Sequence, residues 1–234
     1  MKTITIMLAL AASLLHGLPH ALAADTETAR PLKIPANKAC TEVSPEETTK
    51  LGLIQQMLAE GKPHAALAHL EAARIKNEQA ELLRAHGLRQ TGRALQAQVI
   101  YEQLVNSCVS GQAYRGLGLI ASNAGHLRES LRYLKAASTA LPTEHTIRND
   151  HGYVLMQSGE PEPALHEFLT AVELAPGYRQ AAHNLILLLY RQGDTARAEA
   201  FAKQFGIAAD EMQQLQKMTP ESNRASPESA RSPL

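Results

Sequence analysis

The 234-residue chain carries 23 basic and 23 acidic side chains, so its formal net charge is zero with histidine neutral. Nucleic-acid binding needs a basic stripe, and base stacking or sugar clamping needs aromatic side chains. This chain has no such stripe, no tryptophan and only 4% aromatic residues, which argues against a nucleic-acid partner.

The N-terminal 23 residues have the order of a secretory signal peptide. Lys2 is followed by an apolar run over residues 4–15, then by Pro19 and a small-residue triplet at 21–23. The run is shorter than the roughly 20 apolar residues of a membrane span, so cleavage after residue 23 is preferred over an uncleaved anchor. We expect a periplasmic or secreted chain without a membrane span after cleavage. Loss of Lys2 leaves 23 acids against 22 bases, a net charge of −1.

Residues 24–45 are expected to form an irregular lead-in, because prolines recur through them. At its end, Ser44-Pro45-Glu46-Glu47 has the residue types of a helix start. Serine is suited to the N-cap, proline to the first helical position and the acids to the first turn. Paired helices are therefore expected from about residue 46.

Five glycines recur at nearly constant spacing through residues 46–206. The intervals between them are 31, 33, 34 and 34 residues, and a small residue follows each glycine five positions later. This is the period of the tetratricopeptide (TPR) helical hairpin, so the sequence predicts an all-α TPR solenoid of about five hairpins. An ordinary amphipathic bundle is the alternative, but it has no reason to keep a 34-residue register. The glycines are Gly61, Gly92, Gly125, Gly159 and Gly193.

The fourth repeat shows the physical sense of the pattern. Gly152 and Ala164 are small where two antiparallel helices must approach closely, and Phe168 is expected to fill the gap between successive hairpins. Gly159 suits a left-handed helix end, and Pro176 stops the second helix. With the matching glycines of the third repeat, the structural positions are Gly118, Gly125, Gly152, Gly159, Ala164, Phe168 and Pro176.

After the repeats, residues 207–218 are expected to form a short capping helix with Ile207, Met212, Leu215 and Met218 on one face. A solenoid needs such a cover because its last repeat leaves an apolar face open. Residues 219–234 contain Pro-Glu-Ser twice and are expected to be a solvated, disordered tail. A short docking motif is the alternative for this tail.

Two cysteines occur, Cys40 in the lead-in and Cys108 near the end of the second hairpin. In an oxidising periplasm they are candidates for a disulfide that ties the lead-in to the solenoid. The alternative is a buried Cys108 that acts as a small hydrophobe, with Cys40 free. Spacing alone does not decide between the two.

Motifs of catalysis and metal binding are missing from the sequence. The ten histidines are scattered over different helices and turns, and none forms a His-Glu-x-x-His pattern. No Walker loop and no Gly-x-Ser-x-Gly elbow occurs, and no cysteine or histidine pair has the spacing of a metal-ligand set. We therefore expect no enzymatic activity, no cofactor and no metal site.

Function is therefore expected on the concave surface, which the first helix of each TPR hairpin lines. The mixed set of amide, cationic, aromatic and apolar residues there suits an extended or helical peptide. It lacks the cluster of lysines and asparagines that clamps a terminal carboxylate, so chaperone-tail recognition is disfavoured. For the two tyrosines, packing between neighbouring hairpins is the alternative. The partner-binding candidates are Arg115, Leu119, Asn149, Tyr153, Met156, His183, Leu187 and Tyr190.

A more specific similarity covers roughly residues 111–215. It includes Phe205-Gly206-Ile207, and its most specific part is the string from Arg148 to Tyr153, of the form Arg-Asn-Asp-x-Gly-Tyr. With the generic TPR positions around it, this stretch resembles TadD, the TPR protein family of tight-adherence (Flp-type) pilus assembly. The resemblance implies a periplasmic accessory factor for assembly of a pilus or secretin at the outer membrane. Many relatives are lipoproteins, but Cys40 lies well downstream of the signal, so outer-membrane association would run through a protein partner.

The hypothesis is a periplasmic TPR scaffold that assists assembly of a tight-adherence pilus and its secretion channel. Its expected partner is the secretin or another pilus-assembly component. One alternative is a generic adaptor for envelope biogenesis or another secretion system. The other is a non-catalytic subunit of a periplasmic enzyme complex.

Overall fold

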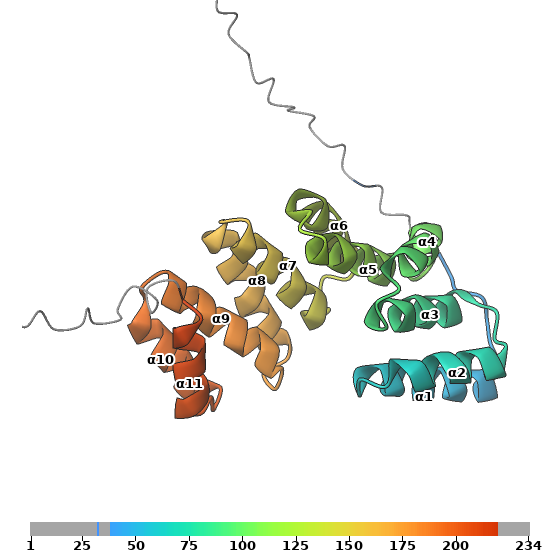
Figure 1. Ribbon diagram of the computed structural model, residues 1–234, viewed down its shortest axis with the longest axis horizontal. Helices are drawn as coiled ribbons and strands as arrows, with labels where there is room; N and C mark the ends of the chain where they lie inside the picture. The colour runs from blue at the N-terminus through green and yellow to red at the C-terminus, as the bar shows by residue number, and fades with distance from the viewer. Residues whose placement is uncertain (1–31, 33–37, 220–234) are drawn as a thin grey trace, which may run out of the picture. The chain divides into compact units, whose positions relative to one another are not determined.

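The computed structural model describes residue 32 and residues 38–219. The predicted signal peptide, most of the lead-in and the tail from residue 220 lie outside these residues. Within the described part the chain forms eleven α-helices and no strand, which confirms the all-α fold (Figure 1). The helices are α1 (Pro45–Ala59), α2 (Pro63–Ala73), α3 (Glu78–Gln90), α4 (Ala94–Leu104), α5 (Ser110–Asn123), α6 (Leu127–Ala140), α7 (His145–Gln157), α8 (Pro161–Leu174), α9 (Arg179–Arg191), α10 (Thr195–Gln204) and α11 (Ala209–Lys217).

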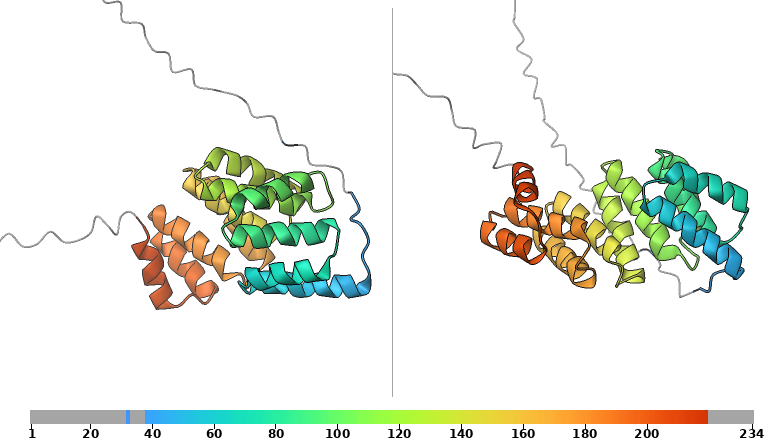
Figure 2. Two further views of the ribbon diagram at one scale, coloured as in Figure 1. Left: turned by 45° about the vertical axis from the view of Figure 1, so that its right-hand side comes forward. Right: turned by 90° about the horizontal axis from the view of Figure 1, so that it is seen from below.

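The helices pair in chain order. Each odd-numbered helix packs against the next even-numbered one, which gives five hairpins from α1–α2 to α9–α10 (Figure 1). The first helices also contact one another in sequence, α1 with α3, α3 with α5, α5 with α7 and α7 with α9. We call the surface shared by these five helices the first-helix face. The last helix, α11, packs on α9 (Figure 2, red).

Each hairpin turns at a glycine in the left-handed backbone region. The five turn glycines have φ between 72° and 79°, a conformation that costs other L-residues about 1–2 kcal/mol. The N–H of the residue after each glycine donates to the carbonyl five residues earlier. Examples are Glu160 to Leu155 at 3.0 Å and His126 to Ala121 at 2.9 Å. This closure satisfies the last carbonyls of the first helix in the same way in every hairpin, which keeps the repeats in register.

Glycines inside the first helices allow the two helices of a hairpin to approach closely. A Cβ atom at Gly152 would lie 2.8 Å from the Phe168 ring, and one at Gly118 would lie 2.7 Å from the Leu134 side chain. Phe168 is fully buried and belongs to the core shared with α9 and α10. Its ring therefore fills space inside its own hairpin as well as toward the next one.

The first helix begins with a complete capping box. Ser44 is the N-cap, its Oγ accepts from the Glu47 N–H at 3.2 Å, and the Glu47 carboxylate accepts from the Ser44 N–H at 2.9 Å. Hydrogen bonds from the Ser44 backbone and side chain lower the pKa of Glu47. Because Pro45 fills the first helical position, where no intrahelical donor is needed, the irregular chain ends sharply here.

A disulfide joins Cys40 to Cys108, with the two Cα atoms 5.2 Å apart. Beside it, the Thr41 N–H and hydroxyl both donate to the Glu78 carboxylate, at 3.0 and 3.1 Å. The two sulfurs and a Glu78 oxygen lie within 4.8 Å of one another. The sulfurs are already bonded to each other and offer no thiolate, so this cluster is a covalent tether in the oxidised protein.

No helix among the described residues is both long enough and apolar enough to cross a membrane.

Candidate functional site

The first-helix face carries two adjoining clefts. The C-terminal cleft has a volume of about 390 Å³ and lies over α5, α7 and α9, with Met218 at its rim. Five of the eight predicted partner-binding residues line it: Leu119, Asn149, Tyr153, Met156 and Leu187. The N-terminal cleft has a volume of about 830 Å³ and lies over α1, α3 and α5; Arg115 and Leu119 line it. Leu119 thus borders both.

Tyr153 is the exposed aromatic residue of the C-terminal cleft. Its exposed fraction is 39%, whereas Met156 and Leu187 beside it are buried at 8% and 4%. A tyrosine that stands above an apolar floor offers a partner a large contact area and a hydroxyl at low entropic cost. This combination is typical of an anchor at a protein interface.

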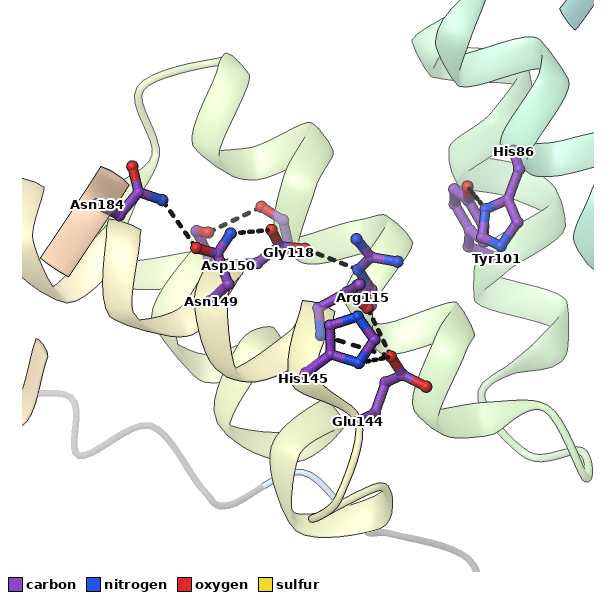
Figure 3. A network of polar contacts seen from close by, with 11 residues as sticks. His86, Tyr101, Arg115, Gly118, Glu144, His145, Asn149, Asp150 and Asn184 are labelled. Carbon is purple, nitrogen blue, oxygen red and sulfur yellow. Dashed lines mark hydrogen bonds and ion pairs between the residues drawn. The ribbon is translucent and has the colours of Figure 1, made fainter. Parts of the chain in front are cut away.

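A ladder of polar contacts fixes the helices beneath this cleft (Figure 3). The Asn184 amide donates to the Asn149 side-chain oxygen at 2.8 Å, and the Asn149 amide contacts Asp150 Oδ1 at 3.4 Å. Arg115 Nε then donates to Asp150 Oδ2 at 2.7 Å. The ladder crosses α9, α7 and α5, and its two asparagines are buried. Because buried amides are costly to leave unpaired, the contacts favour one relative position of the three hairpins.

His183 and Tyr190 lie outside both clefts. His183 Nε2 contacts a Glu211 oxygen of α11 at 2.7 Å, and Arg179 Nη2 donates to the same carboxylate at 2.7 Å. The hydrogen bonds from Arg179 and His183 lower the pKa of Glu211. Tyr190 is buried in the core shared with α10 and α11. These two residues therefore hold the last hairpin and its capping helix together.

The string from Arg148 to Tyr153 divides between two faces of α7. Arg148 Nη1 and His151 Nδ1 contact the Glu167 carboxylate of α8 at 3.1 and 3.2 Å. Burial opposes ionisation of Glu167, but His151 and Arg148 outweigh it and its pKa is lowered. Asn149, like Asp150 and Tyr153, instead lines the C-terminal cleft. The most specific part of the sequence thus combines hairpin packing with a cleft surface.

Six residues of α3 line the N-terminal cleft, none of them among the predicted partner-binding residues, and four of the six follow the repeat register. These four stand 13, 10, 6 and 3 positions before Gly92, the same offsets at which Gln112, Arg115, Leu119 and Ser122 precede Gly125. The repeat register was therefore sufficient to find them, had it been extended to the second repeat. The residues are Gln79, Leu82, His86 and Arg89.

His86 of the N-terminal cleft lies beside Tyr101 (Figure 3), and its surroundings make its electrostatic character unusual. Burial of the imidazole, with the nearby charges of Arg89 and Arg115, lowers the pKa of His86 to about 3. His86 is therefore neutral at pH 7, and its Nδ1 lies 2.7 Å from the Tyr101 hydroxyl. The Arg89 guanidinium hydrogen-bonds the Tyr101 side chain, whereas Arg89 Nε is buried and has no hydrogen-bond partner among the described residues.

Comparison with known proteins finds a curated relative and solved structures that share this fold. The chain is 33% identical over 173 residues to the TPR repeat-containing protein PA4299 of Pseudomonas aeruginosa. The match covers 72% of this chain and 68% of that protein. No protein-family model matches.

Two solved structures share the fold. TTC0263 of Thermus thermophilus, a thermophilic TPR protein, is 23% identical with a TM-score of 0.56 and covers 73% of this chain and 95% of its own. MamA of Desulfovibrio magneticus RS-1 is 16% identical with a TM-score of 0.52 and covers 75% of this chain and 99% of its own. At these identities the likeness concerns the fold alone.

Proposed function

This chain belongs to the TPR repeat-containing proteins, and from that premise we propose that it is a periplasmic scaffold that assists assembly of a tight-adherence pilus and its secretion channel. TPR proteins bind protein partners, and here the C-terminal cleft is the proposed binding surface. The proposal assigns the chain no catalytic step. Its partner is the secretin or another pilus-assembly component, through which the chain associates with the outer membrane.

One observation carries the binding role. The exposed Tyr153 lines the same cleft as the buried Met156 and Leu187, on helices that the Asn149–Asn184 hydrogen bond joins. A rigid platform with an aromatic anchor lowers the ordering cost of binding, because the surface is already in the shape that the partner meets.

Three features support the finer assignment. The Arg-Asn-Asp-x-Gly-Tyr string at 148–153 resembles the TadD family, and in this chain part of it lines the cleft. The N-terminal 23 residues have the pattern of a secretory signal. The Cys40–Cys108 disulfide suits an oxidising compartment such as the periplasm.

The test is complementation of a strain that lacks the gene, with piliation as the readout. We expect Tyr153→Ala to lower partner affinity about tenfold or more, because truncation of a hot-spot aromatic costs about 2 kcal/mol or more and a tenfold change is about 1.4 kcal/mol. The variant should therefore restore pili poorly while keeping wild-type helicity. Leu95→Ala is the matched control: Leu95 is an exposed apolar residue on α4, outside both clefts.

Two results would count against the proposal. If the deletion strain assembles pili normally and keeps an intact envelope, the pilus role is wrong. If Tyr153→Ala complements as well as Leu95→Ala, then the C-terminal cleft is not the binding surface, although another face of the scaffold would still be open to test.

A further inference from the structure

The N-terminal cleft differs in charge from the C-terminal cleft. Three of its described lining residues are cations, Lys38, Arg89 and Arg115, and one is an acid, Glu144. Glu144 is already engaged, because its carboxylate accepts from the Thr146 N–H and hydroxyl at 3.4 and 2.9 Å. Glu144 keeps its charge in these contacts, and Arg115 is paired with Asp150 at 2.7 Å, so Lys38 and Arg89 stand against Glu144 and leave an excess of one positive charge in the cleft.

Arg115 and Arg89 each have guanidinium N–H groups beyond those in the contacts described above. Arg115 contacts Asp150 through Nε, which leaves the Nη donors of the same guanidinium outside that pair. Arg89 Nε is buried and lacks a hydrogen-bond partner among the residues that the structure describes. A buried donor without an acceptor is unfavourable and calls for an explanation. Arg89 as a whole is half-buried and lines the cleft, so a carboxylate bound there would reach this fully buried nitrogen once the Arg89 side chain turns toward it.

The cleft is long, which identifies the kind of ligand. Its lining residues come from α1, α3, α5, the end of α6 and the first turn of α7. Packed helices lie about 8–10 Å apart, so three such steps span roughly 25–30 Å. An extended peptide rises about 3.3 Å per residue, and so about seven to nine residues would fill the span. Gln55, Gln79 and Gln112 stand on successive first helices, where their amides suit peptide backbone groups.

The disulfide contributes to this cleft. Cys108 lines it, and Lys38 lies two residues before Cys40 on the tethered segment. The covalent bond between Cys40 and Cys108 therefore holds Lys38 at the cleft. Lys38 is the third cation there, beside Arg89 of α3 and Arg115 of α5. The charge pattern thus depends on a link between the lead-in and the second hairpin.

We propose that the N-terminal cleft binds an extended acidic peptide segment of a partner protein, with Arg89 and Arg115 as the residues that pair with its carboxylates. This inference rests on the protein-binding function proposed above, but it concerns a separate cleft. The scaffold would then hold its partners at two places, through an aromatic anchor at one and through charge at the other.

The test is the affinity of the purified mature chain for synthetic peptides, measured by fluorescence anisotropy in low salt. The probe alternates glutamate and leucine with both ends blocked; its neutral counterpart carries glutamine for glutamate. We expect the acidic peptide to bind at least about tenfold more tightly than the neutral one and to weaken as salt rises. Arg89→Gln should weaken it about tenfold.

Two variants serve as controls. Arg128→Gln removes an exposed charge from the second-helix side, on α6, and should bind the acidic peptide like the wild type. Tyr153→Ala should also leave this affinity unchanged, which separates the inference from the pilus proposal. Helicity and thermal midpoint confirm that Arg89→Gln is folded; if it is not, Arg89→Lys, which lacks Nε and the bidentate fork, replaces it.

The outcomes that overturn the inference are distinct. Absence of acidic-peptide binding does so, as does equal binding of both peptides or an unchanged affinity in the Arg89 variant. Tighter, Arg89-dependent binding of a single-stranded oligonucleotide or of phosphatidylglycerol vesicles would reassign the cleft to a phosphate-bearing ligand instead.

Discussion

Replacing Phe168 with alanine will lower the free energy of unfolding by about 3–5 kcal/mol, the range for a fully buried phenylalanine. The ring is completely buried in the core of the last two hairpins. It also rests against Gly152, so its loss opens a cavity next to a residue that has no side chain to move into it. Chemical denaturation followed by helicity measures the change.

Gly152→Ala gives the companion test. A methyl group there would lie 2.8 Å from the Phe168 ring, so the single change should destabilise by about 1–3 kcal/mol through overpacking. In the Phe168→Ala background the same methyl enters the cavity, so the double variant should be more stable than the sum of the two single changes predicts. Strict additivity would show that the two residues do not pack on each other.

Removing the disulfide by Cys40→Ser with Cys108→Ser will destabilise the chain by about 4 kcal/mol in the chain-entropy model. The reason is the long loop, since 68 residues separate the two cysteines. Without the disulfide, this loop is unrestrained in the unfolded chain, so the conformational entropy of the unfolded state rises and folding becomes less favourable. The loss should fall on the N-terminal hairpins, because the tether joins the lead-in to the end of the second hairpin.

Thermal unfolding with and without reductant measures this effect. The wild type should lose stability on reduction, whereas the double serine variant should not respond. The affinity of the double serine variant for the acidic peptide should also be lower than that of the oxidised wild type, because Lys38 is no longer held at the N-terminal cleft. Equal stability of the oxidised and reduced wild type would contradict the expectation.

The fold could be predicted from sequence because its signals are local. A left-handed turn needs glycine, and the interval from one such turn to the next is set by the length of a hairpin. Gly125, Gly159 and Gly193 therefore indicate both the helices and their register. The capping box at Ser44 is equally local, since its partners lie three residues apart.

The candidate site could be predicted in part. The register assigned Tyr153 and Leu187 to the inner side of their helices, and both line the C-terminal cleft. The register also placed His183 on the inner side of α9, but it does not show which later helix packs against that side. Glu211 of α11 contacts His183 from 28 residues away. Tyr190 likewise faces a core that only the packed last hairpin creates.

The contacts of the polar ladder have a spacing in the sequence that could have predicted them. Arg115–Asp150 and Asn149–Asn184 are each separated by 35 residues, close to one repeat, so both pairs join neighbouring first helices. Polar residues one repeat apart on the first helices are therefore candidates for contact. The charge of the N-terminal cleft was harder to find, because Lys38 lies in the irregular lead-in and reaches the cleft beside the Cys40–Cys108 disulfide, which the repeat register does not predict.

The most direct test of the binding surface is site-specific photo-crosslinking in the native envelope. A photoreactive phenylalanine analogue replaces Tyr153 in one variant and the exposed Leu95 in the control. We predict a crosslink from position 153 to the secretin or another pilus-assembly component, identified by mass spectrometry, and none from position 95. Crosslinks to the same partner from position 95 but not from 153 would contradict the assignment of the partner to the C-terminal cleft.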